Sequence, residues 1–273
     1  MKPLLVIDAA ESHKQGGLAE IWAHRDLLLL FTRREIQLRY QQTAAGFAWA
    51  VLQQLLIMLV LSGFSALVGV KTGNVPYPLF TISGLVPWMY FTHAFNATTF
   101  SLVSQSEIMV KIYFPRLIVP MAAAAGGAVD FFAAALLLPV FMLYYGVPPT
   151  ATAWSIPLFA VMALAAALAL GLWLSVINVR YKDAGNALPF ILQLMFFTTP
   201  IVYPAALIPE PWRTLGGLNP MYGVIEGFRW AVLGGRGEAL HRSVAVSAVT
   251  IVVLLAGGTA FFRSQESTFI DEM

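Results

Sequence analysis

Long apolar stretches with almost no charged residues recur along this chain and restrict the folds that are open to it. A helix needs about 20 mostly apolar residues to cross the hydrocarbon core of a membrane. Such stretches lie at about residues 47–68, 79–102, 117–145, 154–176, 187–203 and 243–262. Only 11% of the 273 residues are charged, compared with about a quarter in soluble domains. The sequence therefore predicts an all-α membrane protein whose transmembrane domain, residues 44–262, contains six transmembrane helices.

The segments around these spans predict four further elements. Residues 1–17 form an N-terminal tail that is not a signal peptide, because its apolar stretch is short and ends at Asp8. Residues 18–40 mix apolar and basic side chains and predict an amphipathic helix on the membrane surface. Residues 204–242 are rich in proline and glycine, and their apolar stretches are too short to span. We expect short re-entrant helices there, with an ordered external loop as the alternative; residues 263–273 form the C-terminal tail.

The distribution of lysine and arginine predicts which side the ends of the chain face. Six spans place both ends on one side of the membrane. If that side is the cytoplasm, eleven of the 16 basic residues face it and five face outward, as the positive-inside rule requires. Four of those five lie within residues 204–242, so this segment is the weakest part of the topology.

Motifs for catalysis and for cofactor binding are missing from the sequence. The chain has no cysteine, no HExxH or GxSxG motif and no Gly-Lys-Ser/Thr loop for a nucleotide phosphate. We therefore expect no catalytic residue, no metal and no cofactor bound by this chain, and the net charge of +2 does not suggest nucleic acid. His93 and Asp130 are the clear ionisable residues within the spans, and they have either a structural role in helix packing or a functional one.

Aromatic residues and small residues follow helical spacing within the spans. Trp88, Phe91 and Phe95 share one helical face, and Phe131 and Phe132 lie in the third span. These rings either face lipid or line a passage in which they stack on sugar rings. Small residues at intervals of four, Ala122–Gly126 in the third span and Ala163–Ala167–Gly171 in the fourth, predict close helix packing.

Four stretches taken together resemble one family. They are FTRREIQLRYQQTAAGFAWAVLQ (31–53), SGLVPWMYF (83–91), NVRYKDAGNALPFILQLMFFTTPIVYP (178–204) and LNPMYGVIEGFR (218–229). Their order and spacing are similar to those of the membrane subunit of ABC exporters for cell-surface polysaccharides, the type-2 group that serves O-antigen, capsule and teichoic acid. One departure is Gln54, where the family often has proline.

The resemblance implies a channel-forming permease that exports a lipid-linked polysaccharide, most often O-antigen, from the cytoplasm across the bacterial inner membrane. It implies a homodimer with two copies of a cytosolic ATPase, which would bind the ATP and Mg that this chain does not bind. In the family, the surface helix and the loop after the second span, here residues 104–116, contact the ATPase. The matching contact residues are Arg33, Arg34, Glu35, Arg39, Ser106, Glu107, Lys111, Tyr113, Pro115 and Arg116.

Three other functions remain as alternatives to polysaccharide export. The first is an ABC permease for another cargo, such as a lipid or a drug. The others are a membrane-embedded transferase, which would need catalytic polar pairs, and a secondary transporter, which would show paired half-repeats with broken helices. If the chain exports polysaccharide, the aromatic set Trp88, Phe91, Phe95, Phe131 and Phe132 is our candidate for the substrate conduit.

Overall fold

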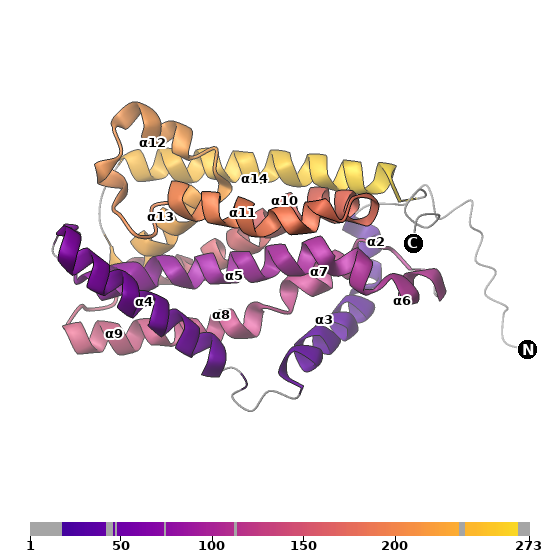
Figure 1. The fold of residues 1–273 in the computed structure, drawn as a ribbon, viewed down its shortest axis with the longest axis horizontal. Helices are drawn as coiled ribbons and strands as arrows, with labels where there is room; N and C mark the ends of the chain where they lie inside the picture. The colour runs from indigo at the N-terminus through magenta and orange to yellow at the C-terminus, as the bar shows by residue number, and fades with distance from the viewer. Residues whose placement is uncertain are drawn as a thin grey trace, which may run out of the picture.

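The computed structural model describes residues 18–41, 46, 48–73, 75–111, 114–234 and 238–266, and in this part of the chain the regular elements are all helices, without strands (Figure 1). The α-helices are α2 (Leu18–Ala23), α3 (Arg25–Tyr40), α4 (Ala48–Val68), α5 (Tyr77–Ser104), α6 (Ser106–Lys111), α7 (Ile118–Ala125), α8 (Ala128–Ala135), α9 (Leu137–Tyr145), α10 (Ile156–Arg180), α11 (Asp183–Thr198), α12 (Glu210–Gly216), α13 (Pro220–Leu233) and α14 (Glu238–Ser264). Short 3-10 helices cover Ala151–Ser155 and Ala205–Leu207. The all-α class is as predicted.

Four helical stretches in the described part of the chain are long and apolar enough to cross a membrane. They are Ala48–Val68, Ile118–Tyr145, Ala151–Arg180 and Leu240–Ser264. They coincide with the first, third, fourth and sixth predicted spans. The third is interrupted, because turns at Gly126–Gly127 and Leu136 divide it into α7, α8 and α9.

The predicted second and fifth spans do not meet the same criteria, for two different reasons. At 28 residues, or about 42 Å, α5 is long enough to cross, but it carries several serine, threonine and asparagine residues. Eighteen of its 28 residues are buried, so protein rather than lipid covers its polar groups. The 16 residues of α11 span only about 24 Å. The number of six spans therefore stays a prediction.

The segment predicted to be re-entrant contains one well-packed helix, α13. Its 14 residues extend about 21 Å, too short to cross. Asn219 caps it by accepting a 3.0 Å hydrogen bond from the backbone N–H of Met221. Eleven of the 14 residues are buried, where α13 packs against α5, α10 and α14. Whether the segment dips into a membrane stays a prediction.

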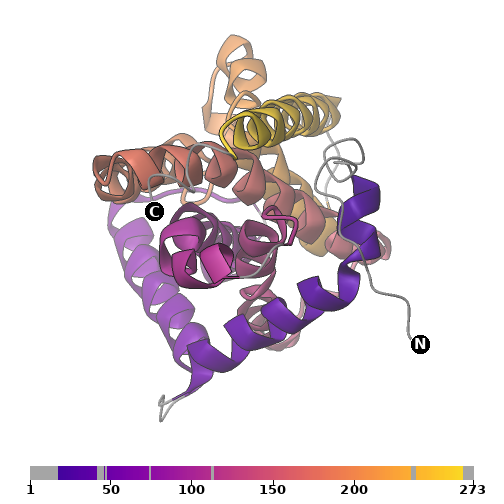
Figure 2. The same ribbon diagram turned by 90° about the vertical axis from the view of Figure 1, so that its right-hand side faces the viewer.

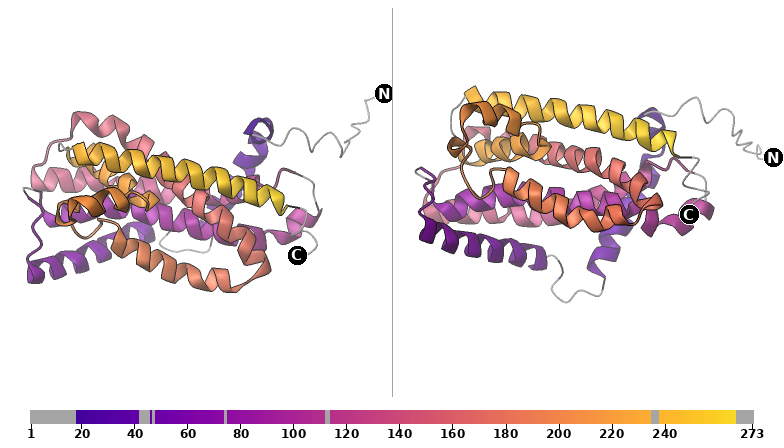
Figure 3. Two further views of the ribbon diagram at one scale, coloured as in Figure 1. Left: turned by 90° about the horizontal axis from the view of Figure 1, so that it is seen from above. Right: turned by 45° about the horizontal axis from the view of Figure 1, so that its top comes forward.

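The helices form an elongated bundle around α5, with two distinct ends (Figure 1). At one end, which we call the α6 end, lie α2, α6 and the last turns of α14. At the opposite end, the α12 end, lie α12 and the turns that follow α4 and α9. The last helix, α14, runs the length of the bundle (Figure 3), whereas α3 runs across it (Figure 2) and packs against α7.

Candidate functional site

The predicted ATPase-contact residues of α3 lie on two different faces of the helix. Arg33 and Arg34 are exposed to solvent. Glu35 and Arg39, one helical turn apart, are partly buried and have partners inside the chain. Arg33 and Arg34 are thus free to meet another protein, whereas Glu35 and Arg39 fasten α3 to the bundle.

Glu35 connects α3 to the end of α5 and to the break in the third span. Its carboxylate accepts a hydrogen bond from the side-chain amide of Gln105, the residue that follows α5. A Cβ atom at Gly126 would lie only 3.1 Å from the Cβ of Glu35, so glycine permits the close approach of α3 there. Burial raises the pKa of Glu35, and the nearby Arg34 partly opposes this shift.

Arg39 and Tyr40, at the end of α3, both contact the carboxylate of Asp130 in α8. An Nη atom of Arg39 lies 2.5 Å from Oδ2 of Asp130, and the Tyr40 hydroxyl donates to Oδ1. Asp130 is only 5% exposed, so Arg39 supplies the counter-charge to its carboxylate and the Tyr40 hydroxyl a hydrogen bond. Burial, together with the hydrogen bond to Asp130, raises the pKa of Tyr40 to about 12, so the hydroxyl remains a donor at neutral pH.

His93 in α5 completes this group of side chains. Its Nδ1 lies 3.1 Å from an Nη atom of Arg39. A guanidinium can only donate, so Nδ1 accepts and the imidazole is neutral with its proton on Nε2. Arg39, Tyr40, His93 and Asp130 are hereafter called the α3 anchor. The sequence had singled out His93 and Asp130 separately, and Arg39 is the residue that joins them.

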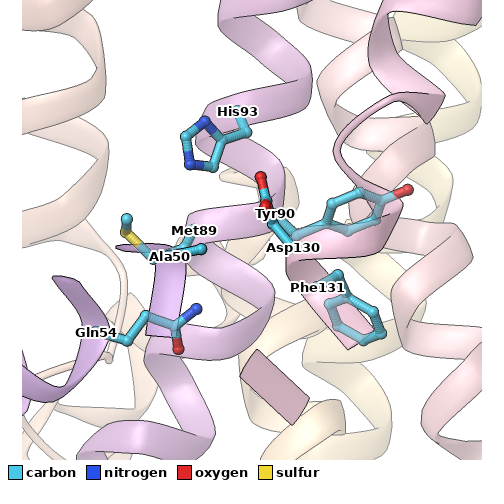
Figure 4. Close-up of a pocket in the computed structure, with 7 residues that line it drawn as sticks. All are labelled: Ala50, Gln54, Met89, Tyr90, His93, Asp130 and Phe131. Carbon is cyan, nitrogen blue, oxygen red and sulfur yellow. The ribbon is translucent and has the colours of Figure 1, made fainter. Parts of the chain in front are cut away.

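A small pocket opens beside the α3 anchor between α4, α5 and α8. It is lined by Ala50, Gln54, Met89, Tyr90, His93, Asp130 and Phe131 (Figure 4). Gln54 is 3% exposed, and its side-chain oxygen has no hydrogen-bond partner among the described residues. Gln54 thus contributes a buried polar group to this pocket, a role that its position in an apolar span did not reveal.

The predicted coupling loop, residues 104–116, lies at the α6 end and contains the short helix α6 (Figure 1). Glu107 is exposed and Ser106 is partly exposed. Pro115 is partly buried, and Arg116 donates a 2.6 Å hydrogen bond to the backbone carbonyl of Glu266, beyond α14. The side chain of Lys111 and all of Tyr113 lie outside the described residues.

The predicted conduit rings fall into two environments. Trp88, Phe91 and Phe95 are at most 5% exposed and follow one another along α5, with ring centroids 5.4 and 5.5 Å apart. Phe131 is 4% exposed, whereas Phe132 is 67% exposed. Four of the five rings therefore pack inside a single chain, and only Phe132 reaches its surface. Their predicted role in a conduit stays a prediction.

Comparison with known proteins identifies the family. The family model described as ABC-2 type transporter matches residues 26–233, which is more than half of the chain. The chain belongs to the ABC-2 type transporter family. This membership and the apolar helices make it a multi-pass membrane protein and a transport permease rather than an enzyme.

Several curated relatives of this ABC-2 permease match over nearly their whole length. An O-antigen export system permease protein RfbA from Klebsiella pneumoniae is 27% identical, covering 90% of this chain and 94% of the relative. An O-antigen export system permease protein RfbA from Myxococcus xanthus is 29% identical, covering 93% of this chain and 98% of the relative. The polysialic acid transport protein KpsM from Escherichia coli is 22% identical, covering 87% of this chain and 92% of the relative.

Proposed function

We propose that this chain is the channel-forming subunit of an ATP-driven exporter that moves a lipid-linked surface polysaccharide, O-antigen, from the cytoplasm across the bacterial inner membrane. The observation that carries the proposal is the similarity to O-antigen export permeases, which covers 90% or more of this chain and 94% or more of theirs. Both KpsM and RfbA carry polysaccharide cargoes in their names. The chain would thereby serve lipopolysaccharide biosynthesis.

Deletion of the gene tests this function. A strain without it should lose its surface polysaccharide and accumulate lipid-linked polymer on the cytoplasmic side, and a plasmid copy should restore export.

A second candidate is export of a lipid or drug, because an Escherichia coli inner membrane transport permease, YadH, is 24% identical over 69% of this chain. Unchanged surface polymer in the deletion strain, together with a changed lipid profile or drug sensitivity, would favour that candidate.

The energy for export would come from a separate ATPase, present in two copies. The sequence has no phosphate-binding loop, so ATP and Mg would be bound by the partner. Among the predicted contact residues, Arg33, Arg34 and Glu107 are exposed and Ser106 is partly exposed, so they are accessible to a partner. Co-purification of the ATPase with a tagged chain tests the partnership, and Arg33→Glu with Arg34→Glu should weaken it.

Two copies of the chain would form the passage. The centre of one chain is filled by α5, whose side chains pack against α4, α10 and α13, so a polymer has no evident path through a single bundle. The outward faces of α4 and α11 carry large exposed apolar side chains, among them Phe64 and Phe197, which fit a second copy or lipid. Co-purification of two differently tagged copies tests the homodimer.

The buried rings would keep such a passage closed at rest. Trp88, Phe91 and Phe95 pack against each other, and Trp88 also contacts Phe196 of α11 at 5.6 Å between ring centroids. Their separation during transport would expose aromatic faces to the C–H faces of sugars. Phe132, already at the surface, would meet the cargo or the second copy first.

A further inference from the structure

The α3 anchor joins a helix that runs across the bundle to the interrupted third span. Arg39 and Tyr40 are the last residues of α3, and Asp130 lies in the first turn of α8, just beyond the Gly126–Gly127 break. On the other side of that break, α3 packs against α7. Both sides of the break are therefore held by the same surface helix.

The contacts on the two sides of the break differ in kind. Towards α7 the contact is a close approach of side chain to backbone, since a Cβ at Gly126, the residue after α7, would lie 3.1 Å from the Cβ of Glu35. Towards α8 it is an ion pair with a buried carboxylate. Because Asp130 is only 5% exposed, its carboxylate would be left buried without its cationic partner, at a high cost, if α8 did not follow Arg39.

We infer that the Arg39–Asp130 pair couples the movement of α3 to that of α8. A displacement of α3 is transmitted through the pair to α8 and bends the third span at Gly126–Gly127. The inference rests on the proposed function, in which α3 receives the movement from the ATPase. Arg39 and Asp130 are positioning residues, because they act on the span and not on the cargo.

The geometry favours transmission over simple attachment. If the pair served only to hold α3 in place, Glu35–Gln105 and the packing on α7 already provide two attachments to the bundle. The pair adds a connection to a different element, α8, beyond the break. His93 of α5 contacts Arg39 from the centre of the bundle and supplies a second partner for the guanidinium.

The test places a spin label on α8 and asks whether it responds to ATP. The chain has no cysteine, so Leu136→Cys, a site 69% exposed at the end of α8, can carry a single label. The complex with its ATPase is reconstituted in lipid nanodiscs and measured with and without ATP, alongside ATP hydrolysis. Asp130→Asn and Arg39→Gln remove the pair, and Asp130→Glu keeps its charge. Arg25→Gln is the matched control, because it breaks an exposed pair, Arg25–Asp26, on the same helix.

The inference expects an ATP-dependent spectral change in the unmodified complex, in Asp130→Glu and in Arg25→Gln. It expects a change at least about fivefold smaller in Asp130→Asn and Arg39→Gln, while hydrolysis stays within about twofold. A full response in both pair-breaking variants overturns the inference and leaves the proposed function standing. Equal loss of response, hydrolysis and assembly in these variants also overturns it, in favour of a purely structural role. If the unmodified chain neither binds an ATPase nor responds to ATP, the proposed function is wrong, and the inferred coupling of α3 to α8 is wrong with it.

Discussion

Arg229 is a buried cation in α13, and its guanidinium touches three segments of the chain. One Nη atom lies 2.5 Å from the carboxylate of Glu226, and the other donates a 2.9 Å hydrogen bond to the carbonyl of Pro200. The guanidinium carbon also lies 3.8 Å from the ring centroid of Phe80. A short helix with few exposed residues is in this way fixed to α5 and to the end of α11.

Replacing Arg229 by methionine should destabilise the protein, because it leaves the partly buried Glu226 carboxylate without a partner. Loss of one member of a buried pair costs about 3–5 kcal/mol, which should appear as a lower melting temperature of the detergent-purified chain. The double variant Glu226→Gln with Arg229→Met should recover part of the loss, because the unpaired charge is then absent. Arg25→Met, at a side chain that is 60% exposed, should melt like the unmodified protein, and a normal melt for Arg229→Met would refute this role.

The burial of Arg229 and its partners could not be predicted from the sequence. By position it counts among the basic residues outside the membrane, against the positive-inside rule. Its 8% exposure shows that it is a paired, buried charge rather than a loop charge. The partners Phe80 and Pro200 are more than 25 residues away in the sequence, so no local pattern could indicate them. Arg39 is a similar case, since the family resemblance implied a contact with the ATPase, whereas the contacts it makes here are with Asp130 and His93.

At the scale of elements, small residues determine how closely helices approach. Ala163, Ala167 and Gly171 are all buried in α10, which packs against α5, so the close packing predicted from their spacing is confirmed. The sequence could not name α5 as the partner. It also could not predict the division of the third span into α7, α8 and α9, because the apolar character continues unbroken through the turns.

Gly171→Ala should lower stability, because its Cβ would lie 2.5 Å from the side chain of Thr98 in the neighbouring helix. Overpacking of this kind costs about 1–3 kcal/mol. Gly63→Ala is the matched control, since no atom lies within 4 Å of a Cβ there and alanine favours a helix by about 1 kcal/mol over glycine. Thermal unfolding in detergent should rank Gly63→Ala at or above the unmodified chain and Gly171→Ala below it; the reverse order would contradict the packing argument.

The short helix α6 is the element we expect to couple ATP hydrolysis to export. Charge reversal at Glu107 and Lys111 together should leave the chain inserted and the ATPase active, because neither residue belongs to an apolar span. Surface polymer should fall at least about fivefold while hydrolysis by the purified complex persists. Normal export by this double variant would remove α6 from the coupling route, and the single variants would show which charge matters.

On the scale of the whole molecule, the apolar stretches predicted the helical class and four helices that can span. The central position of α5 was not predictable, because its hydropathy is reduced by polar residues that only tertiary packing makes acceptable. Both α6 and the last turns of α14 lie at one end of the bundle, an arrangement that agrees with an even number of crossings. The side of the membrane on which this end lies is a separate prediction.

Single cysteines test that orientation. Asp183→Cys lies at the start of α11, and Lys71→Cys and Ala151→Cys follow α4 and precede α10; all three positions are exposed. In intact spheroplasts an impermeant thiol reagent should label Lys71→Cys and Ala151→Cys but not Asp183→Cys, because the α6 end is expected to face the cytoplasm. Permeabilised spheroplasts should label all three as a control. The opposite pattern would invert the topology, and equal labelling of all three would argue against a bundle that spans.

The aromatic column in α5 leads to the last prediction, which separates closure from sugar stacking. Phe91→Ala with Phe95→Ala removes two buried rings and opens a cavity; each such change costs about 3–5 kcal/mol, so assembly of the dimer must be checked first. In assembled complexes reconstituted into liposomes, the alanine pair should raise resting ion leak or lower export.

Phe91→Leu with Phe95→Leu is the matched control, because leucine retains much of the bulk without an aromatic face. If the rings act by bulk alone, the leucine pair stays closed and exports normally; if they act by stacking on sugars, it stays closed but exports less. Normal export and normal leak in the alanine pair would place both rings in the structural core alone.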